Sequence, residues 1–115
     1  MPFGADNLET LLLTDKQVKG LLSMSEVMDA VELAFKQKGI GRVQMPAKVY
    51  LNFNKYNGDL RTMPSYLEEL DISAVKIVNV HPDNPAKHKL PTVMAVIILV
   101  DPSRGFPLAI MGGQH

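Results

Sequence analysis

The fold of this chain is decided by Ile72-Ser73-Ala74-Val75-Lys76-Ile77-Val78-Asn79-Val80. Successive side chains of a β-strand point to opposite faces of the sheet. In this segment both faces are apolar, one carrying Ile72, Ala74, Val78 and Val80 and the other Val75 and Ile77. The pattern predicts a strand that is covered on both sides, because a strand with one solvated face would alternate strictly between apolar and polar residues.

The segments before this strand predict a β-hairpin. Residues 49–53 alternate between apolar and more polar side chains, which is typical of a half-buried strand. Asn57-Gly58 follows, and both residues tolerate the left-handed backbone conformation that a tight reversal needs. We expect the returning strand to run from Asp59 to Met63 and to be limited by Pro64, since proline cannot donate to the hydrogen-bond ladder.

Three further strands are predicted outside this hairpin. The stretch from Thr92 to Val100 is apolar on both faces, like the strand over Ile72 to Val80. A turn over Asp101 to Gly105 leads into a strand over Phe106 to Met111. Near the N-terminus, Leu8 to Leu13 forms a short apolar run that predicts a first strand.

Two helices are predicted between the first strand and the hairpin. Thr14 and Gln17 have the spacing of a capping box, which places a short helix over Asp15 to Leu22. A second helix follows, and Gly39 and Gly41 end it because glycine accepts positive φ. Its apolar face recurs at steps of three and four residues: Met24, Val27, Met28, Val31, Ala34 and Phe35.

The order of these elements predicts the fold class α+β, as a single domain over residues 1–115. We expect an N-terminal helical hairpin packed on a mostly antiparallel sheet. One helical hairpin covers only one face of a sheet, whereas the central strands are apolar on both. The second face therefore needs a second subunit or a further part of the polypeptide.

Composition excludes several classes of function. Twelve basic and twelve acidic residues cancel, so no net charge favours nucleic acid or an anionic membrane. Cysteine is absent, which excludes disulfides, thiolate metal sites and a cysteine nucleophile. The first residues lack the basic and apolar regions of a secretory signal, and the longest apolar run, Val93 to Val100, is too short to cross a bilayer. We expect a soluble, cytoplasmic protein.

Lys76 and Arg61 are candidate ligand-binding residues. Lys76 shares its predicted strand face with apolar residues, where an ammonium group loses hydration unless it meets an anion or a polar cavity. It either extends to the rim of the sheet or stands at a ligand, where it would polarise a carbonyl or transfer a proton. Arg61 follows the hairpin turn, where it is either solvated or grips a carboxylate with two parallel hydrogen bonds. On neighbouring strands, the two would form a small cationic pocket.

Other polar residues point less clearly to chemistry. Thr92 opens an apolar strand and either caps the backbone locally or faces a ligand. His81, His88 and His115 have no recognised metal-ligand spacing, so we predict no metal site. The sequence contains neither a Ser/His/Asp arrangement nor a glycine-rich phosphate-binding loop, and Gly39-Ile40-Gly41 lacks the third glycine. From the residues alone, the prediction is a ligand-binding α+β domain.

Seven ordered stretches of the chain resemble the N-terminal part of the ornithine cyclodeaminase/mu-crystallin family, especially its archaeal alanine dehydrogenase branch. The resemblance covers nearly the whole chain. The stretches are Leu11-Leu12-Leu13-Thr14, Ser23 to Glu32, Met45 to Leu51, Gly58-Asp59-Leu60-Arg61-Thr62-Met63-Pro64, Val75-Lys76-Ile77-Val78-Asn79-Val80-His81-Pro82, Leu90 to Ala95 and Gly105 to Met111.

The resemblance implies an NAD(P)-dependent enzyme that acts on a small amino or keto acid. It implies that Arg61 binds the substrate α-carboxylate and that Lys76, as a catalytic residue, sits beside the reacting carbon. It also implies that Thr92 contacts the NAD or NADP cofactor, and that this segment builds the interface of a homodimer. The substrate stays open among alanine or pyruvate, ornithine and cyclic ketimines.

The resemblance also shows what the sequence departs from. The family continues into a Rossmann domain with a glycine-rich loop and a catalytic aspartate, and neither lies in these residues. Gly112 stands where an acidic residue is usual in that branch, and the loop Ala86 to Lys89 is slightly longer. We therefore expect no turnover and no tight cofactor binding from these 115 residues alone. Alternatives are a stand-alone module that dimerises or binds small carboxylates, and a trimmed or frameshifted gene.

Overall fold

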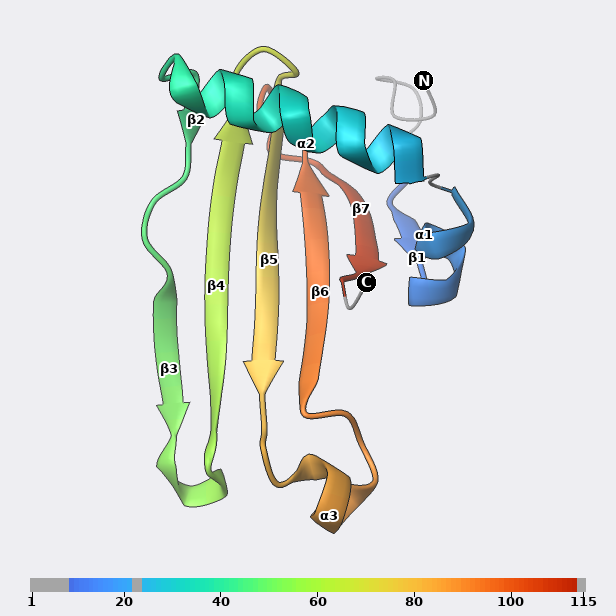
Figure 1. The fold of residues 1–115 in the computed structure, drawn as a ribbon, viewed down its shortest axis with the longest axis vertical. Helices are drawn as coiled ribbons and strands as arrows, with labels where there is room; N and C mark the ends of the chain where they lie inside the picture. The colour runs from blue at the N-terminus through green and yellow to red at the C-terminus, as the bar shows by residue number, and fades with distance from the viewer. Residues whose placement is uncertain (1–8, 22–23, 114–115) are drawn as a thin grey trace.

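The computed structural model of the chain describes residues 9–21 and 24–113. Figure 1 shows a sheet of long, neighbouring strands, with one long helix that crosses the strands near one end and shorter helices at its margins. The elements in chain order are β1 (Leu11–Leu13), α1 (Asp15–Leu21), α2 (Met24–Gly39), β2 (Val43–Gln44), β3 (Val49–Phe53), the 3-10 helix η1 (Asn54–Tyr56), β4 (Gly58–Leu67), β5 (Ile72–Val80), α3 (Asn84–His88), β6 (Val93–Val100) and β7 (Pro107–Gly112).

The strands form one seven-stranded sheet in the order β1-β7-β6-β5-β4-β2, with β3 also paired to β4. All pairs are antiparallel except β1 with β7. The predicted α+β class with a mostly antiparallel sheet is confirmed. The strand predicted over Ile72–Val80 is β5, an internal strand between β4 and β6. Its internal position pairs both of its edges with neighbouring strands.

The prediction that Pro64 ends the returning strand is wrong. Strand β4 continues through Pro64 to Leu67 and pairs with β5 along this whole stretch. On its other side, β4 pairs with β3 as far as Thr62 and with β2 from Tyr66 onward. Pro64 lies in the gap between these two neighbours, where no strand needs the hydrogen bond that proline cannot donate.

The turn between β3 and β4 confirms the predicted hairpin but is longer than a two-residue reversal. The 3-10 turn η1 precedes Asn57, which adopts the left-handed conformation with a φ of 50°. Gly58 then packs directly on the imidazole of His81, and a β-carbon at position 58 would overlap His81 Nδ1. Phe53 stacks on the same imidazole, with ring centroids 6.0 Å apart.

The helices begin and end where the sequence predicts, within the described residues. Thr14 N–H donates to Gln17 Oε1 (2.8 Å) and Gln17 N–H donates to Thr14 Oγ1 (3.1 Å), which is a complete capping box at the start of α1. Helix α2 ends at Gly39. The predicted outer ends, Leu8 of the first strand and Leu22 of the first helix, lie outside the described residues. No helix in the described part of the chain has the length and apolarity to cross a membrane.

The predicted packing of a helical hairpin on the sheet is not confirmed. Helix α1 contacts β1 and β7, and α2 contacts the short strand β2. In Figure 1, α2 runs crosswise to the strands. From its predicted apolar face, Met28 and Val31 are exposed, while the side chains of Met24, Val27, Ala34 and Phe35 lie outside the described part of the structure.

The sheet leaves much of its apolar surface uncovered. Among the described residues, the buried apolar side chains are only Val78, Ala95 and Ala109, on the neighbouring strands β5, β6 and β7. On strand β3, Val49 is 60% exposed and Leu51 is 56% exposed. Exposed apolar patches of this kind mark surfaces that contact a partner or another part of a protein.

Asn84 organises the loop between β5 and β6. Its side chain is buried, and its Nδ2 donates to the carbonyl of Pro91 (3.0 Å). Its backbone N–H donates to the His81 carbonyl, and its carbonyl accepts from Leu90 N–H. One buried asparagine thus joins both ends of the loop between β5 and β6.

We expect Gly58→Ala to lower the free energy of unfolding by about 1–3 kcal/mol, because the new methyl group displaces the His81 ring from a packed position. Gly20→Ala is the matched control, since nothing lies within 4 Å of a β-carbon there and alanine favours a helix. Urea denaturation of both variants measures the effect. Equal stability of the two variants would contradict the packing of His81 on Gly58.

We expect Asn84→Ala to lower the free energy of unfolding by about 1–3 kcal/mol, because it removes the buried amide and leaves the Pro91 carbonyl without its donor. Asn52→Ala, at an exposed position in β3, is the control and should change stability little. Thermal unfolding followed by circular dichroism measures both. A loss no larger than that of the control would show that the loop does not depend on Asn84.

Candidate functional site

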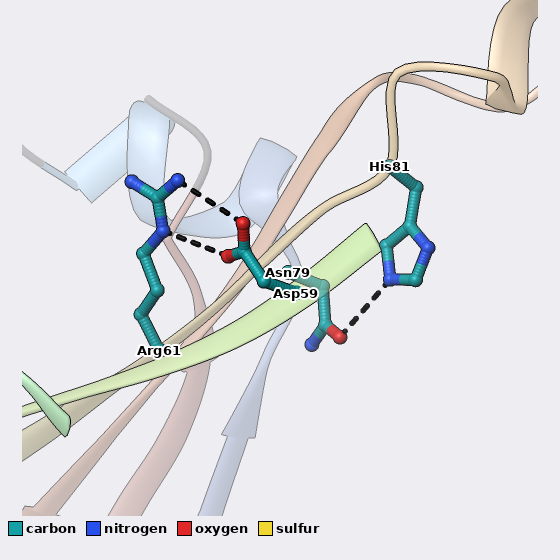
Figure 2. Close-up of polar contacts among 4 residues, drawn as sticks. All are labelled: Asp59, Arg61, Asn79 and His81. Atoms are coloured by element: carbon teal, nitrogen blue, oxygen red, sulfur yellow. Dashed lines mark hydrogen bonds and ion pairs between the residues drawn. The ribbon is translucent and has the colours of Figure 1, made fainter. Parts of the chain in front are cut away.

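Arg61 lies on β4 and forms a two-bond ion pair with Asp59 of the same strand. Arg61 Nε donates to Asp59 Oδ1 (2.8 Å), and Arg61 Nη2 donates to Asp59 Oδ2 (3.3 Å), as Figure 2 shows. The two residues are two positions apart, so their side chains leave the same face of the sheet. Their side chains are only 30% and 21% exposed.

The aromatic ring of Tyr50 forms a second contact with Arg61. Tyr50 lies opposite Arg61 in the β3–β4 register, and its ring centroid is 5.0 Å from the guanidinium carbon. This distance is typical of a cation–π interaction. The hydrogen bond from Arg61 lowers the pKa of the Asp59 carboxyl below its usual value, and the same bond raises the pKa of Arg61. Both groups are therefore charged near neutral pH.

The ion pair leaves part of the guanidinium group available. A guanidinium has five N–H donors, and Asp59 uses one on Nε and one on Nη2. Two of the remaining N–H bonds lie parallel on the edge formed by Nη1 and Nη2. That edge matches the two oxygens of a carboxylate.

Lys76 lies near Arg61 on the same face. In the β4–β5 register, Arg61 is opposite Val78 and Lys76 is opposite Met63, so the two cations are diagonal neighbours. Such neighbours have Cα atoms roughly 7–8 Å apart. The predicted proximity of Arg61 and Lys76 on neighbouring strands agrees with this register.

The surroundings of Lys76 are apolar. Lys76 is half-buried at the middle of internal strand β5, with Met63 and Ile97 directly opposite on β4 and β6. This position argues against the interpretation that Lys76 extends to the rim of the sheet. Among the ion pairs of the described residues, none includes Lys76.

Thr92 lies apart from the two cations. It directly precedes β6, and its carbonyl accepts a hydrogen bond from His81 N–H (2.7 Å). In the β5–β6 register Lys76 pairs with Ile97, five residues along the chain from Thr92, which is roughly 16 Å of strand. The structure thus brings Arg61 and Lys76 together and places Thr92 toward one end of the same sheet.

Asn79 and His81 lie on the opposite face of β5 from Lys76. Asn79 Oδ1 is 3.3 Å from His81 Nε2, as Figure 2 shows, so this pair organises the end of β5 and does not contact Arg61. Among the described residues, no group of three or more His, Asp or Glu side chains is arranged to hold a metal ion.

Arg61 and Lys76 are both half-buried. A cavity of about 250 Å³ lies beside Asp59 at the hairpin end, and Gly58, Val80 and Pro82 also line it. Arg61 and Lys76 are not among its lining residues.

Sequence reasoning missed Asp59 and Tyr50. The pairing of Asp59 with Arg61 was predictable from the sequence, because residues two positions apart on a strand point to the same face of the sheet. The contact of Tyr50 with Arg61 was not predictable, since it depends on the register of two strands whose connecting turn has a length that the sequence does not fix.

Comparison with known proteins identifies the family of this chain. The model of the ornithine cyclodeaminase/mu-crystallin family matches residues 8–115. The alanine dehydrogenase of Archaeoglobus fulgidus is 54% identical over 108 residues, which is 94% of this chain and 32% of that protein.

Two solved structures share the fold with substantial sequence identity. An archaeal alanine dehydrogenase dimer with bound NAD has a TM-score of 0.82 and 53% identity, over 90% of this chain and 31% of that one. The Delta(1)-pyrroline-2-carboxylate reductase of Thermococcus litoralis, in complex with NADH and L-proline, has a TM-score of 0.86 and 42% identity, over 91% of this chain and 32% of that one. The chain spans about a third of the length of these relatives, and it belongs to the ornithine cyclodeaminase/mu-crystallin family.

Proposed function

We propose that this chain supplies the substrate-binding and dimerisation portion of an NAD(P)-dependent dehydrogenase or cyclodeaminase that acts on a small amino or keto acid. The observation that carries this proposal is the placement of Arg61 and Lys76 as diagonal neighbours on one face of the sheet. Relatives named as an alanine dehydrogenase and as a pyrroline-2-carboxylate reductase act on substrates of this chemical class.

Arg61 would bind the α-carboxylate of the substrate. Its Nη1–Nη2 edge offers two parallel N–H donors, while Asp59 engages the adjacent edge. A carboxylate held in this way fixes both the position and the plane of the substrate. Fixed orientation is the main requirement of a hydride transfer between two bound molecules.

Lys76 would act at the reacting carbon next to that carboxylate. The diagonal separation of the two residues allows one small molecule to contact both side chains. The Lys76 ammonium would donate a hydrogen bond to the carbonyl oxygen or imine nitrogen and withdraw electron density from the carbon. Its apolar neighbours, Met63 and Ile97, would exclude water and strengthen this interaction.

Among the candidate residues, Thr92 is the one that would contact a nicotinamide cofactor. Thr92 offers a hydroxyl at the end of the sheet, and the sequence has no glycine-rich loop for the cofactor phosphates. When bound, the cofactor would supply or accept the hydride. Thr92 would help to seat it, and the choice between NAD and NADP would depend on residues outside this chain.

A second subunit would complete the sheet. We propose that α1 and α2 cover one face and that a second copy covers apolar surface exposed on β3, where Val49 and Leu51 are more than half exposed. The archaeal alanine dehydrogenase with the same fold is a dimer. The exposed β3 residues also favour the alternative function, a stand-alone module that dimerises or binds small carboxylates without catalysis.

We expect pyruvate to bind the chain saturably and Arg61→Ala to raise its dissociation constant at least about tenfold, because a charge-assisted pair of hydrogen bonds is lost. Isothermal titration calorimetry measures both. Arg104→Ala is the matched control, since Arg104 pairs with Asp101 (2.7 Å) at the distant β6–β7 turn. Equal binding by the wild type and Arg61→Ala would contradict the proposed role of Arg61.

We expect the chain to sediment at twice its own mass and Leu51→Lys to shift it toward the monomer, because a charge replaces an apolar contact on edge strand β3. Leu70→Lys, at an exposed apolar position in the β4–β5 turn, is the control. Sedimentation velocity at several protein concentrations separates the two states. A monomeric wild type, or a variant that dimerises as well as the wild type, would contradict an interface at β3.

A further inference from the structure

The position of Asp59 raises a question about the proposed substrate site, because an acid next to a carboxylate-binding arginine would repel the substrate. Both Asp59 oxygens accept hydrogen bonds from Arg61, at 2.8 and 3.3 Å. Asp59 therefore either competes with a substrate for the guanidinium or holds the guanidinium in place for it. These two roles predict opposite effects when Asp59 is removed.

We propose that Asp59 is a positioning residue, which holds the side edge of the Arg61 guanidinium so that its terminal edge is presented to one planar carboxylate. This inference rests on the proposed function of Arg61 as the substrate carboxylate ligand. It adds the substrate class that the site selects: monoanionic acids with a planar carboxylate, in preference to tetrahedral dianions such as phosphonates.

The hydrogen-bond geometry supports the positioning role. Asp59 bonds to the edge that Nε and Nη2 form, and not to the edge formed by Nη1 and Nη2. Binding at the side edge fixes the rotation of the guanidinium plane while it leaves the two parallel terminal donors available. The Tyr50 ring, 5.0 Å from the guanidinium carbon, packs against the same group and further restricts its movement.

The charge of the site supports the selection of a monoanion. Arg61 and Lys76 contribute two positive charges and Asp59 contributes one negative charge, so the three residues together carry one positive charge. That charge matches one carboxylate. Because Asp59 offsets one positive charge, a dianion would be attracted less strongly to this site than to two cations without an acid beside them. A tetrahedral group would also align poorly with two parallel donors.

The test compares pyruvate with acetylphosphonate, an analogue whose carboxylate is replaced by a phosphonate. We expect the wild type to prefer pyruvate. Asp59→Ala should bind pyruvate at least about tenfold more weakly although it removes a negative charge, because the guanidinium loses its fixed orientation. The same variant should also lose most of the preference for pyruvate over acetylphosphonate, a ratio that a purely structural defect would not change.

Two further variants make the test specific. Asp59→Asn keeps one oxygen that can accept from Arg61 Nε, so its pyruvate affinity should fall between those of the wild type and Asp59→Ala. Asp101→Ala removes another acid that is paired with an arginine, at the β6–β7 turn, and should leave pyruvate binding unchanged. Circular dichroism spectra confirm that each variant is folded, and Asp59→Asn serves as the test if Asp59→Ala is not.

The outcomes separate the two proposals. If Asp59 variants bind pyruvate as tightly as the wild type or more tightly, while Arg61→Ala loses binding, Asp59 is a competitor or a bystander and the positioning role is overturned. If Arg61→Ala binds as well as the wild type, or if the wild type does not bind pyruvate, the proposed function fails and the role of Asp59 fails with it.

Discussion

The antiparallel register between β4 and β5 is the constraint on which the rest of the candidate site depends. It pairs Arg61 with Val78 and Met63 with Lys76, which brings the two cations to one face. A slip of one residue would move every side chain of one strand to the opposite face and would separate Arg61 from Lys76. The apolar residues of β5 resist such a slip, since it would exchange the buried side chain of Val78 for a neighbour of different size and polarity.

The same register decides how the charges interact. Two cations on diagonal positions repel each other, and the repulsion is stronger where apolar side chains such as Met63 and Ile97 exclude water. Asp59 shares their face and balances the charge of Arg61 through two hydrogen bonds. The face can therefore carry both cations at a modest electrostatic cost, and Lys76 remains the charge without an acidic partner among the described ion pairs.

Local sequence patterns predicted most of the helices and strands. The features that they did not predict depend on how distant strands pair. The strands over Val49–Phe53 and Ile72–Val80 and the Thr14–Gln17 capping box each depend on a few adjacent residues, and each is confirmed. The half-burial predicted for the first strand is not, since Val49 and Leu51 are exposed. The passage of β4 through Pro64 depends instead on a gap between two other strands, which no local pattern reveals. Arg61 and Lys76 were predicted as site residues because they are cations in a hairpin and in an apolar strand. The contact of Tyr50 with Arg61 could be identified only from the register of the sheet.

The exposure of strand β3 follows from the limited cover of the sheet. A sheet whose internal strands are apolar on both faces needs cover on both, and the main contacts of α1 and α2 with the sheet are those to β1, β7 and β2. Strand β3 lies away from these contacts, and its residues Val49 and Leu51 are exposed. A group that covered the face of Arg61 and Lys76 would exclude water from both side chains. The same contact would then complete both the cover of the sheet and the proposed substrate site. The loop that Asn84 organises holds Thr92 at one end of the same sheet, away from both cations.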